Sequence, residues 1–547
     1  MGRAKGQANG RQALAISVRV LRALALALFV QCCLLSVRAQ AVYHNPVMAG
    51  DYPDPTVLRV GADYWALVTT GGWAPHFTIL HSTDLVNWRT VGAAFQEKPA
   101  WAKGDFWAPE LIEDRGQFYL YYTARRDDGP NKKGTLCVAV ATAAQPAGPW
   151  TDHGPVVCQD IGSIDAFSLR DERGQRYLIW KEDGNDRNEP TPIWAQPLTE
   201  DGLKLTGKRK ELIRNDAPWE RHVVEGAYVL RHGDYFYLFY SGNACCGRGC
   251  NYALGVARAK KLLGPWEKYA GNPIIGANAA WQCPGHGDVV TTPDDGYYLL
   301  YHSYRQRADT FNVGREAVLD RIEWTDKGWP AVNRGGGPSN AASAPVGVGE
   351  RTDDDEFFSG FNSAQLDAAF QWPMRSEQSA HVDTTHGGFL LLAPEKQGAV
   401  EDAWTGAVVG VRAPAGDYVA TTLLDAKALQ PAARAGLAAY SWRDAAVGIA
   451  AGGDGKVYVW RREGRDTRTL ATATVSNAPV LYLRMTVAGG ETYRFAYSMN
   501  GRDWSEAGTP VSAGYIEAAH VALTAAGPAG AAARFDWLRV KPNKHPR

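Results

Sequence analysis

The sequence lacks a net charge of either sign. Lys and Arg together number 58, and Asp and Glu also number 58, so the formal charge at pH 7 is zero. Proteins that bind nucleic acid or an anionic membrane usually carry an excess of Lys and Arg on one surface. The balanced charge therefore argues against nucleic acid and membrane lipid as the main partner.

Long apolar runs are also scarce. The longest, Ala23–Val37, has 15 residues and is short for a membrane span. It follows a basic N-terminal segment and precedes an Ala-x-Ala sequence at Ala39–Ala41. This order is typical of a secretory signal peptide. We therefore expect residues 1–41 to be removed, and the mature protein to be secreted or periplasmic and free of the membrane.

Cysteine is limited to eight residues, and none follows position 283. Two of them lie in the expected signal peptide. The other six are Cys137, Cys158, Cys245, Cys246, Cys250 and Cys283. An even number in an exported chain suggests disulfides, and no histidines lie at zinc-binding spacing from the CCGRGC segment. The sequence leaves the pairing of these cysteines open.

Clear amphipathic helices are missing from the region before residue 333, where a strand pattern recurs instead. A short aromatic strand ends in a small or polar residue at five places: WALVT from Trp65, YLYYT from Tyr119, YLIWK from Tyr177, YLFYS from Tyr237 and YLLYH from Tyr298. A second strand-like run follows each of them. The motifs recur at similar spacing, with no clear helix between them. Such repetition indicates a radial arrangement of four-stranded sheets. We predict an all-β fold with a five-bladed β-propeller over residues 42–333.

Five residues occupy similar positions upstream of these aromatic strands, eleven or twelve residues before the start of each motif. In a propeller, the innermost strand of each blade lines the central channel, so equivalent positions converge on one axis. The convergent set is Asp54, Trp107, Asp165, Glu225 and His286.

Three carboxylic acids and a histidine around one axis are not what a protein core needs, because a buried charge is costly unless it is paired or used. Hydrolysis of a glycosidic bond needs one carboxylic acid to protonate the leaving oxygen. It also needs one carboxylate to activate water or to attack the sugar. A third carboxylate beside the acid would help to keep that acid protonated. The predicted channel therefore suits glycoside hydrolysis.

The segments that carry these groups resemble the motifs of glycoside hydrolase family 43. They are PDPT around Asp54, SIDAF around Asp165 and VVEGAY around Glu225, with further similarity in FWAPEL, GHGDVV and VGREAVL. The resemblance covers about Tyr43–Asn333. It implies a five-bladed propeller, an inverting mechanism, and release of α-L-arabinofuranose or β-D-xylose from plant polysaccharides or oligosaccharides such as arabinan, arabinoxylan and xylo-oligosaccharides.

The same resemblance assigns roles to residues of this chain. Asp54 is the general base, Glu225 is the general acid, and Asp165 modulates the pKa of the acid and orients it. Substrate contacts are expected from Arg315, which could also hold Asp165 ionised, and from Trp107, Trp73 and His286. Simple packing is the alternative for both tryptophans. No cofactor is required, although some relatives hold a calcium ion in the channel, here near His286. Glu110 is expected to be structural, bonding the blade backbone.

A second domain follows a segment rich in Gly, Pro, Ser and Ala. We expect a linker at residues 334–350 and a β-sandwich at residues 351–547, because long alternating strands with Gly-Gly and Asn-Gly turns dominate this part. It resembles the concanavalin-like domain appended to many family 43 enzymes. Three roles stay open: a loop that reaches over the channel and favours exo-action, a carbohydrate-binding module, or a stabilising partner.

Other activities remain as alternatives. An endo-1,5-α-L-arabinanase of the same family would differ only in loops that close or open the channel. A retaining, fructan-cleaving propeller enzyme is disfavoured, because PDPT, SIDAF and VVEGA lack its Asn-Asp-Pro, Arg-Asp-Pro and Glu-Cys motifs. A non-catalytic glycan-binding propeller would be expected to lack one of the three carboxylic acids. The sequence does not specify the sugar, the linkage or the oligomeric state.

Overall fold

The computed structural model describes residues 41–129, 132–307, 310–345, 347–348, 356–374, 379–385, 387–393, 403–475, 478–528 and 531–543. The expected signal peptide lies outside these residues, apart from position 41. Within the described part of the chain, no helix combines the length and apolar character that crossing a membrane requires.

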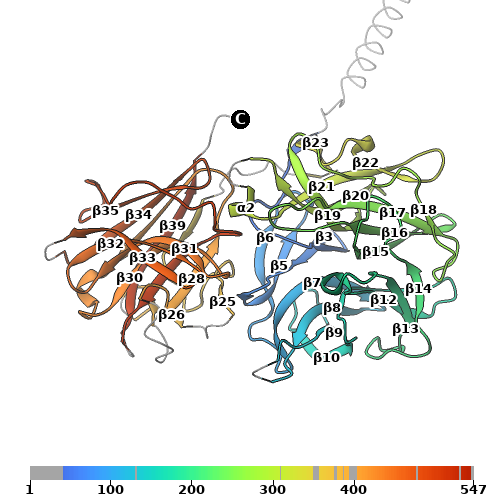
Figure 1. Cartoon of the computed structure of the whole chain (residues 1–547), viewed down its shortest axis with the longest axis horizontal. Helices are drawn as coiled ribbons and strands as arrows, with labels where there is room; N and C mark the ends of the chain where they lie inside the picture. The colour runs from blue at the N-terminus through green and yellow to red at the C-terminus, as the bar shows by residue number, and fades with distance from the viewer. Residues whose placement is uncertain are drawn as a thin grey trace, which may run out of the picture. The chain divides into compact units, whose positions relative to one another are not determined.

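The described residues form five antiparallel sheets of four strands each, in sequence order (Figure 1). Blade 1 contains β2 (Thr56–Val60), β3 (Asp63–Val68), β5 (His76–Ser82) and β6 (Arg89–Phe95). Blade 2 contains β7 (Ala102–Asp114), β8 (Gln117–Arg126), β9 (Leu136–Ala143) and β10 (Thr151–Val157). Blade 3 contains β11 (Ser163–Arg170), β12 (Arg176–Glu182), β13 (Ile193–Pro197) and β14 (Lys210–Ile213).

Blade 4 contains β15 (Val224–His232), β16 (Tyr235–Gly242), β17 (Ala253–Ala259) and β18 (Glu267–Lys268). Blade 5 contains β19 (Trp281–Thr291), β20 (Tyr297–Arg305), β21 (Glu316–Trp324) and β22 (Pro330–Val332). Shorter elements are β1 (Val42–His44), β4 (Trp73–Ala74), η1 (Asn185–Arg187), α2 (Thr310–Val313), η2 (Asn333–Gly335) and β23 (Ala341–Ser343). The five predicted aromatic motifs all fall on second strands: β3, β8, β12, β16 and β20.

The first strand of each blade lies innermost. β2 contacts β7, and the contacts continue through β11, β15 and β19 back to β2, so the five strands form a closed ring. The N-terminal segment adds to blade 5, because the Asn45 side chain exchanges two hydrogen bonds with the backbone of Leu319 in β21. The predicted five-bladed propeller is confirmed.

The aromatic strands are buried on both faces because each blade is covered by its two neighbours. In β8, Tyr122 packs edge-on against Phe77 of blade 1, with ring centroids 5.2 Å apart. The preceding Tyr121 points to the other face, in a cluster with Trp180 of blade 3. This two-sided burial explains why the aromatic motifs are continuous apolar runs instead of alternating apolar and polar residues.

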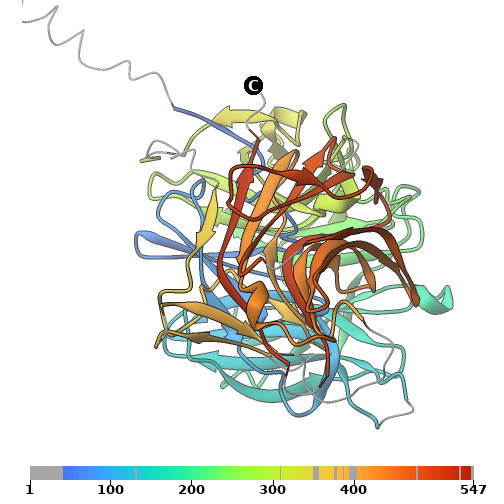
Figure 2. The same ribbon diagram turned by 90° about the vertical axis from the view of Figure 1, so that its left-hand side faces the viewer.

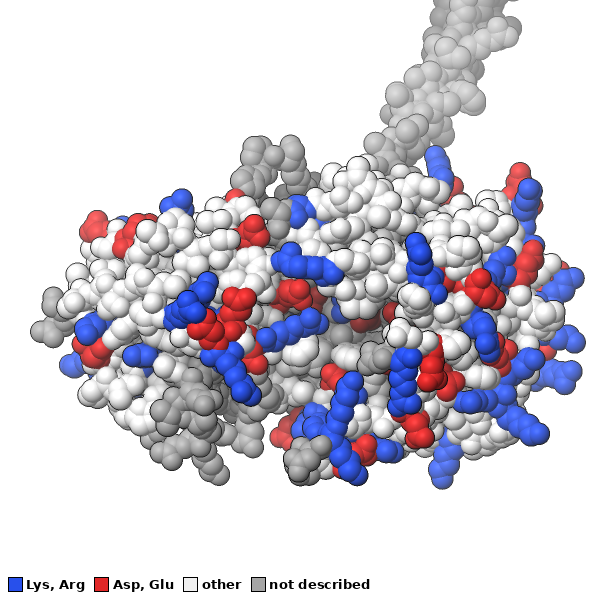
Figure 3. Space-filling view, in the orientation of Figure 1, with Lys and Arg blue, Asp and Glu red and all other residues white. Residues whose placement is uncertain are grey.

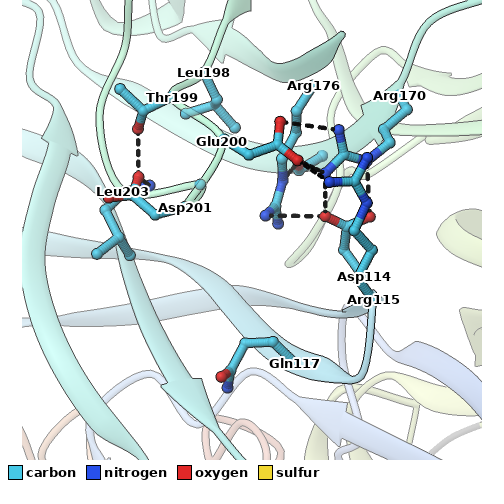
Figure 4. Close-up of polar contacts among 12 residues, drawn as sticks. Asp114, Arg115, Gln117, Arg170, Arg176, Leu198, Thr199, Glu200, Asp201 and Leu203 are labelled. Atoms are coloured by element: carbon cyan, nitrogen blue, oxygen red, sulfur yellow. Dashed lines mark hydrogen bonds and ion pairs between the residues drawn. The ribbon is translucent and has the colours of Figure 1, made fainter. Parts of the chain in front are cut away.

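A polar cluster joins blades 2 and 3 at the ends of β7 and β11 (Figure 4). Arg170 donates to both carboxylate oxygens of Asp114, at 2.9 and 2.6 Å, and also to Glu200 at 2.8 Å. The buried Arg176 lies 3.5 Å from Asp114 and stacks on the Tyr119 ring at 3.8 Å. Because paired Arg–carboxylate bonds are directional and strong, this cluster fixes the two blades to each other.

The C-terminal region is a β-sandwich of two antiparallel sheets, drawn in orange and red in Figure 2. One sheet has β26 (Ala380–Asp383), β27 (Phe389–Leu392), β39 (Ala533–Pro542), β29 (Tyr418–Leu424), β34 (Leu481–Ala488), β35 (Thr492–Ser498) and β36 (Ser505–Glu506), with β24 (Phe357–Ser359) and β37 (Val511–Ser512) at its margins. The other has β28 (Ala407–Arg412), β38 (His520–Ala526), β30 (Arg434–Ser441), β31 (Ala445–Gly452), β32 (Lys456–Glu463) and β33 (Asp466–Thr474). The short elements β25 (Trp372–Pro373) and η3 (Ala426–Ala428) complete it.

The sandwich strands alternate where the propeller strands do not. In β34, every second residue from Leu481 to Val487 is buried, and the residues between them are partly exposed. One face of this sheet therefore packs on a core while the other meets solvent, which is the pattern expected of a sandwich. The predicted fold of the second domain is confirmed.

The residues predicted as a linker are partly held by the propeller. The Ser339 hydroxyl donates to Asp320 of β21, and the Trp281 indole of β19 donates to the Asn340 side chain at 2.9 Å. β23 then begins at Ala341. Part of the predicted linker therefore packs on blade 5, and its start at residue 334 stays a prediction.

The six cysteines form three disulfides: Cys137–Cys158, Cys245–Cys246 and Cys250–Cys283. The first lies within blade 2 and the segment that follows it. The third joins the loop after β16 to β19 and so links blades 4 and 5. These pairings agree with the expectation that the cysteines of an exported chain are oxidised.

Candidate active site

Each blade has a residue with left-handed backbone at an equivalent position on or just before its inner strand, and β7 and β19 carry a second such residue, Asp105 and Cys283. The five are Asp54 (φ 52°), Ala108 (43°), Asp165 (54°), Gly226 (60°) and His286 (45°). In β7, β11, β15 and β19 the pairing register shifts at this point, as in a β-bulge. Such conformations cost about 1–3 kcal/mol for non-glycine residues and cluster at functional sites. In blades 1, 3 and 5 the residue predicted to face the channel is the left-handed residue itself. In blades 2 and 4 the predicted residues, Trp107 and Glu225, come one residue before it.

The residue that ends each aromatic motif ties its blade to the next one. Asp165 N–H donates to Thr123 at 3.3 Å, and His286 N–H donates to Ser241 at 2.8 Å. The same bonds run from Ala108 N–H to Thr69 at 2.7 Å and from Asp54 N–H to His302 at 3.1 Å, which returns blade 5 to blade 1. Sequence reasoning noted these terminal polar residues but gave them no role.

Asp54 is a buried carboxylate surrounded by hydrogen-bond donors and cations. Its Oδ1 lies 3.0 Å from Arg315 Nη1 and 3.5 Å from His286 Nδ1, and its Oδ2 accepts from the Thr69 hydroxyl at 2.7 Å. Burial raises the pKa of Asp54, but Arg315, then His286 and His302, outweigh burial and hold the pKa well below its usual range. Asp54 is therefore ionised and suited to accept a proton.

The backbone around Arg315 aims its side chain at Asp54. Arg315 N–H donates to Asp51 Oδ1 at 2.9 Å, and Tyr52 N–H donates to the Arg315 carbonyl at 2.8 Å. Gly314 is required beside them, since its φ is 99° and a Cβ there would come within 2.3 Å of the Asp51 carboxylate. The expectation that Arg315 pairs with Asp165 is wrong, because Asp51 directs it to the general-base position instead.

Asp165 is buried among groups of both charges, with Glu225 and Asp54 opposing the effect of His286 and Lys181. Its Oδ2 accepts from Gly226 N–H at 2.9 Å, which joins β11 to the residue after Glu225 in β15. Burial is the main cause that raises the pKa of Asp165 to about 6, and the neighbouring Glu225 adds to it, while His286 opposes. Asp54 and Asp165 thus differ strongly in their tendency to hold a proton, as acid–base chemistry with two carboxyl groups requires.

Glu225 is buried at the start of β15 and is paired with a lysine that sequence reasoning missed. Lys181 Nζ donates to Glu225 Oε2 at 2.6 Å and to Asp183 Oδ1 at 2.9 Å. Lys181 ends the YLIWK motif of β12, at the same place in its blade as Thr69, Thr123, Ser241 and His302. Its position in the repeat was the signal that could have identified it.

His286 lies between the carboxyl groups. Burial lowers its pKa, but Asp165, then Asp54 and Glu225, raise the pKa above its ordinary value. The neighbouring His302 is different, since burial lowers its pKa to about 4, and its Nδ1 accepts from the Asp54 backbone. His286 thus provides positive charge among the acids, and His302 is neutral and holds the Asp54 backbone.

A calcium ion near His286, which the family resemblance allows, has few side-chain ligands available. No group of three or more His, Cys, Asp or Glu side chains is placed to hold a metal ion in the described part of the chain. Calcium takes six to eight oxygen ligands, and the Asp54 carboxylate beside His286 is already paired with Arg315. These side chains alone do not form a calcium site, and the mechanism below uses no metal.

The two predicted tryptophans have different surroundings. Trp107 is half-buried on β7 and lies one residue before the left-handed Ala108, and its contact with a sugar stays a prediction. Trp73 is only 4% exposed and stacks on His520 of the sandwich, with ring centroids 3.6 Å apart. The expectation that Trp73 walls the sugar subsite is therefore wrong, because β4 pairs with β25 and turns this ring into the sandwich.

Glu110 bonds a carboxyl group instead of the blade backbone. It is buried three residues after Trp107, in contact with Asp288 of β19. Burial, followed by Asp288, raises the pKa of Glu110 well above its usual range, so it is neutral and can donate to Asp288. The pair of Glu110 and Asp288 links blades 2 and 5. It does not include any of the three predicted catalytic carboxyl groups.

Comparisons with known proteins agree with this geometry. A family model described as "Glycosyl hydrolases family 43" matches residues 43–330, and a model described as "Beta xylosidase C-terminal Concanavalin A-like domain" matches residues 359–541. Xylosidase/arabinosidase 43B from Humicola insolens is 28% identical over 546 residues, covering 92% of this chain and 98% of the relative. Extracellular exo-alpha-(1->5)-L-arabinofuranosidase ArbA from Cellvibrio japonicus is 32% identical over 326 residues, covering 52% of this chain and 86% of the relative.

Solved structures share the whole arrangement. The GH43 BlXynB protein from Bacillus licheniformis superposes with a TM-score of 0.78 at 26% identity, covering 92% of this chain and 100% of that one. The family model spans more than half of the sequence, and it contains all three carboxylic acids of the channel. The chain therefore belongs to glycoside hydrolase family 43.

Proposed function

We propose that the chain is an exported, inverting glycoside hydrolase that releases α-L-arabinofuranose, β-D-xylose or both from plant cell-wall polysaccharides and oligosaccharides. The observation that carries this proposal is the division of the channel carboxyl groups into two environments. Asp54 is held ionised by Arg315, while Asp165 and Glu225 lie together on the neighbouring strands β11 and β15. One side of the channel thus offers a base and the other an acid.

The mechanism follows from this division. Glu225 donates its proton to the glycosidic oxygen, and the bond between that oxygen and the anomeric carbon breaks with its electron pair going to the oxygen. A water molecule attacks the anomeric carbon from the opposite face and loses a proton to Asp54. Asp165 orients the acid through its bond to Gly226 and adds negative charge beside it. The two carboxyl groups of an inverting enzyme lie about 6.5–9.5 Å apart, so that water fits between them.

The choice of sugars is supported by the relatives. The Humicola protein is named a xylosidase/arabinosidase, and the Cellvibrio protein an exo-acting arabinofuranosidase. Neutral pentose polymers need no charged docking surface, and basic and acidic side chains are interspersed on the face shown in Figure 3. The word extracellular in the name of the Cellvibrio relative supports export, in line with the expected signal peptide.

Exo-action is supported by the closeness of sandwich residues to the general base. The Trp442 ring lies against Gly72, where a Cβ would come within 2.4 Å of it, and Gly72 follows the Asp54 partner Thr69 by three residues. Asn312 of α2 donates to the Ala513 carbonyl of the sandwich at 3.1 Å, just before Arg315. Sandwich residues in these positions would shorten the channel to a pocket that admits only the ends or the side branches of a polysaccharide.

The test is hydrolysis of two aryl glycosides, an α-L-arabinofuranoside and a β-D-xyloside, alongside linear arabinan. We expect cleavage of at least one aryl glycoside and release of free pentose from oligomers. Asp54→Asn and Glu225→Ala should each lose at least about 10²-fold in kcat. Short oligomers from arabinan as the first products would favour the endo-arabinanase alternative. No turnover of any substrate, with oligosaccharide binding retained, would favour a glycan-binding propeller.

A further inference from the structure

The polar residue that ends the second strand departs from its pattern in one blade. In four blades this residue is Thr, Ser or His, and it accepts a backbone N–H from the next blade. In blade 3 it is Lys181, a cation with no accepting atom, and its side chain is fully buried. A buried ammonium is far more costly than a buried hydroxyl group unless it is paired. A residue that differs in type from the equivalent residues of the other blades is expected at a functional position.

We propose that Lys181 is a positioning residue for the acid step: it orients the Glu225 carboxyl group and stabilises the carboxylate that forms when Glu225 gives up its proton. The inference rests on the proposed function, since it takes Glu225 as the general acid. It adds a residue that acts through Glu225 without touching the sugar.

The geometry divides the two oxygens of Glu225 between two tasks. Glu225 Oε2 accepts a hydrogen bond from Lys181 Nζ at 2.6 Å. Asp183 Oδ1 accepts a second hydrogen bond from the same nitrogen at 2.9 Å. Among the described residues, no hydrogen bond to Oε1 is found. The proton that protonates the glycosidic oxygen is therefore carried by Oε1, while Oε2 is held by the lysine.

The charges around Glu225 come from three strands. Lys181 faces it from β12, Asp165 from β11 and His286 from β19, with the neutral Tyr252 beside them. Burial disfavours the ammonium, but Glu225, followed by Asp183 and Asp165, raises the pKa of Lys181 above its ordinary value. Lys181 therefore keeps its charge and its protons throughout the reaction.

The effect on catalysis follows from where charge develops. As the proton leaves Oε1 for the leaving-group oxygen, negative charge builds up on Glu225 within contact of a fixed cation. A fixed opposite charge in a dry site stabilises such a transition state without reorganisation. The rate increase due to Lys181 is largest for leaving groups that need full protonation, such as a sugar hydroxyl. It is smallest for 2,4-dinitrophenolate, which leaves without a proton.

The test uses the full chain carrying Lys181→Met, which removes the charge, and Lys181→Gln, which removes the charge but keeps an N–H donor for Glu225. Each variant is assayed on a pentose disaccharide and on the matching 2,4-dinitrophenyl glycoside. We expect kcat/KM for the disaccharide to fall about 10²–10³-fold, and for the dinitrophenyl glycoside less than about tenfold.

Lys268→Met is the matched control. Lys268 makes a comparable ion pair with the buried Glu220, at 2.7 and 2.8 Å, on the outer strand of blade 4. Its loss should affect stability, but kcat/KM for the two substrates should change alike. Lys181→Arg, which keeps the charge, should retain more of the disaccharide activity than Lys181→Met.

Glu225→Gln in the same assay separates failure of the inference from failure of the proposed function. If Glu225→Gln spares the dinitrophenyl glycoside and the Lys181 variants lose both substrates equally, Glu225 is the acid and the inference about Lys181 is overturned. If Glu225→Gln itself shows no such split, the acid assignment fails first. Failure of both Lys181→Met and Lys181→Gln to fold would assign Lys181 to stability and would also overturn the inference.

Discussion

Replacing Arg315 with methionine should move the acid limb of the pH profile. Asp54 must be ionised to take a proton from water, so kcat/KM falls when the pH drops through the pKa of Asp54 in the free enzyme. In the native chain that pKa is held well below its usual range, chiefly by Arg315 against the effect of burial. Arg315→Met leaves burial in place and removes the main opposing charge, so the pKa rises and the acid limb moves to higher pH.

The magnitude follows from the geometry of the pair. Arg315 Nη1 lies 3.0 Å from Asp54 Oδ1, and both side chains are largely buried. Two unit charges about 4 Å apart interact by about 4 kcal/mol at an effective dielectric constant near 20. One pKa unit corresponds to about 1.4 kcal/mol, so the upper bound is a shift of about 3 units. His286 remains beside Asp54 and offsets part of the loss, so we expect a shift of about 2 units.

The assay is kcat/KM on an aryl pentoside between pH 3.5 and pH 9. Arg315→Lys should keep the limb close to its native position, because the charge is retained although the geometry of the guanidinium is lost. Arg412→Met is the control for a neighbouring cation, since Arg412 bonds the Asp51 carbonyl at 2.8 Å and does not reach Asp54. A rise in KM with an unmoved acid limb in Arg315→Met would refute the reasoning, because Arg315 would then only bind substrate.

Three further changes test other parts of the structure. Asp165→Asn should lower kcat but stabilise the fold at pH 8 by about 1–3 kcal/mol in urea unfolding, with no gain at pH 4. Burial raises the pKa of Asp165 to about 6, so its cost to folding begins above the unfolded pKa of about 3.9 and is complete above about pH 6. Arg170→Ala should lower the free energy of unfolding by about 1–3 kcal/mol without changing the pH profile, because it breaks the paired bond to Asp114. Trp73→Ala should cost about 3–5 kcal/mol of stability, because its ring is buried against the sandwich, and a raised KM with unchanged stability would restore Trp73 to the sugar subsite.

The fold was predictable because its local pattern agrees with its global symmetry. Five aromatic runs at similar spacing became five second strands, and each run is apolar throughout because neighbouring blades cover both faces. β34 shows the contrasting alternation in the sandwich, where one face is solvated. Composition does not show that part of the predicted linker packs on the propeller, because a segment rich in Gly and Pro can also form a turn held by side chains such as Ser339.

The site was predictable in its carboxyl groups and less so in their partners. Counting residues upstream of each strand finds Asp54, Asp165 and Glu225, but it does not show that Glu225 lies one residue before the left-handed position that Asp165 occupies in its blade. Arg315 comes from a loop far along the chain, so only the folded backbone decides which carboxylate it meets. Lys181 stood at the end of a motif that had already been identified, and comparison of the five motif ends would have singled it out.

The most direct measurement of the central claim is a proton NMR time course of the anomeric signals during hydrolysis of the better aryl pentoside, with Glu225→Ala as the control. The account predicts that the first sugar released has the opposite anomeric configuration to the substrate, before mutarotation. It also predicts that the variant gives no product on that timescale when the aryl group needs a proton to leave. A first product of unchanged configuration would make Asp54 a nucleophile and would contradict the division of the channel into a base and an acid.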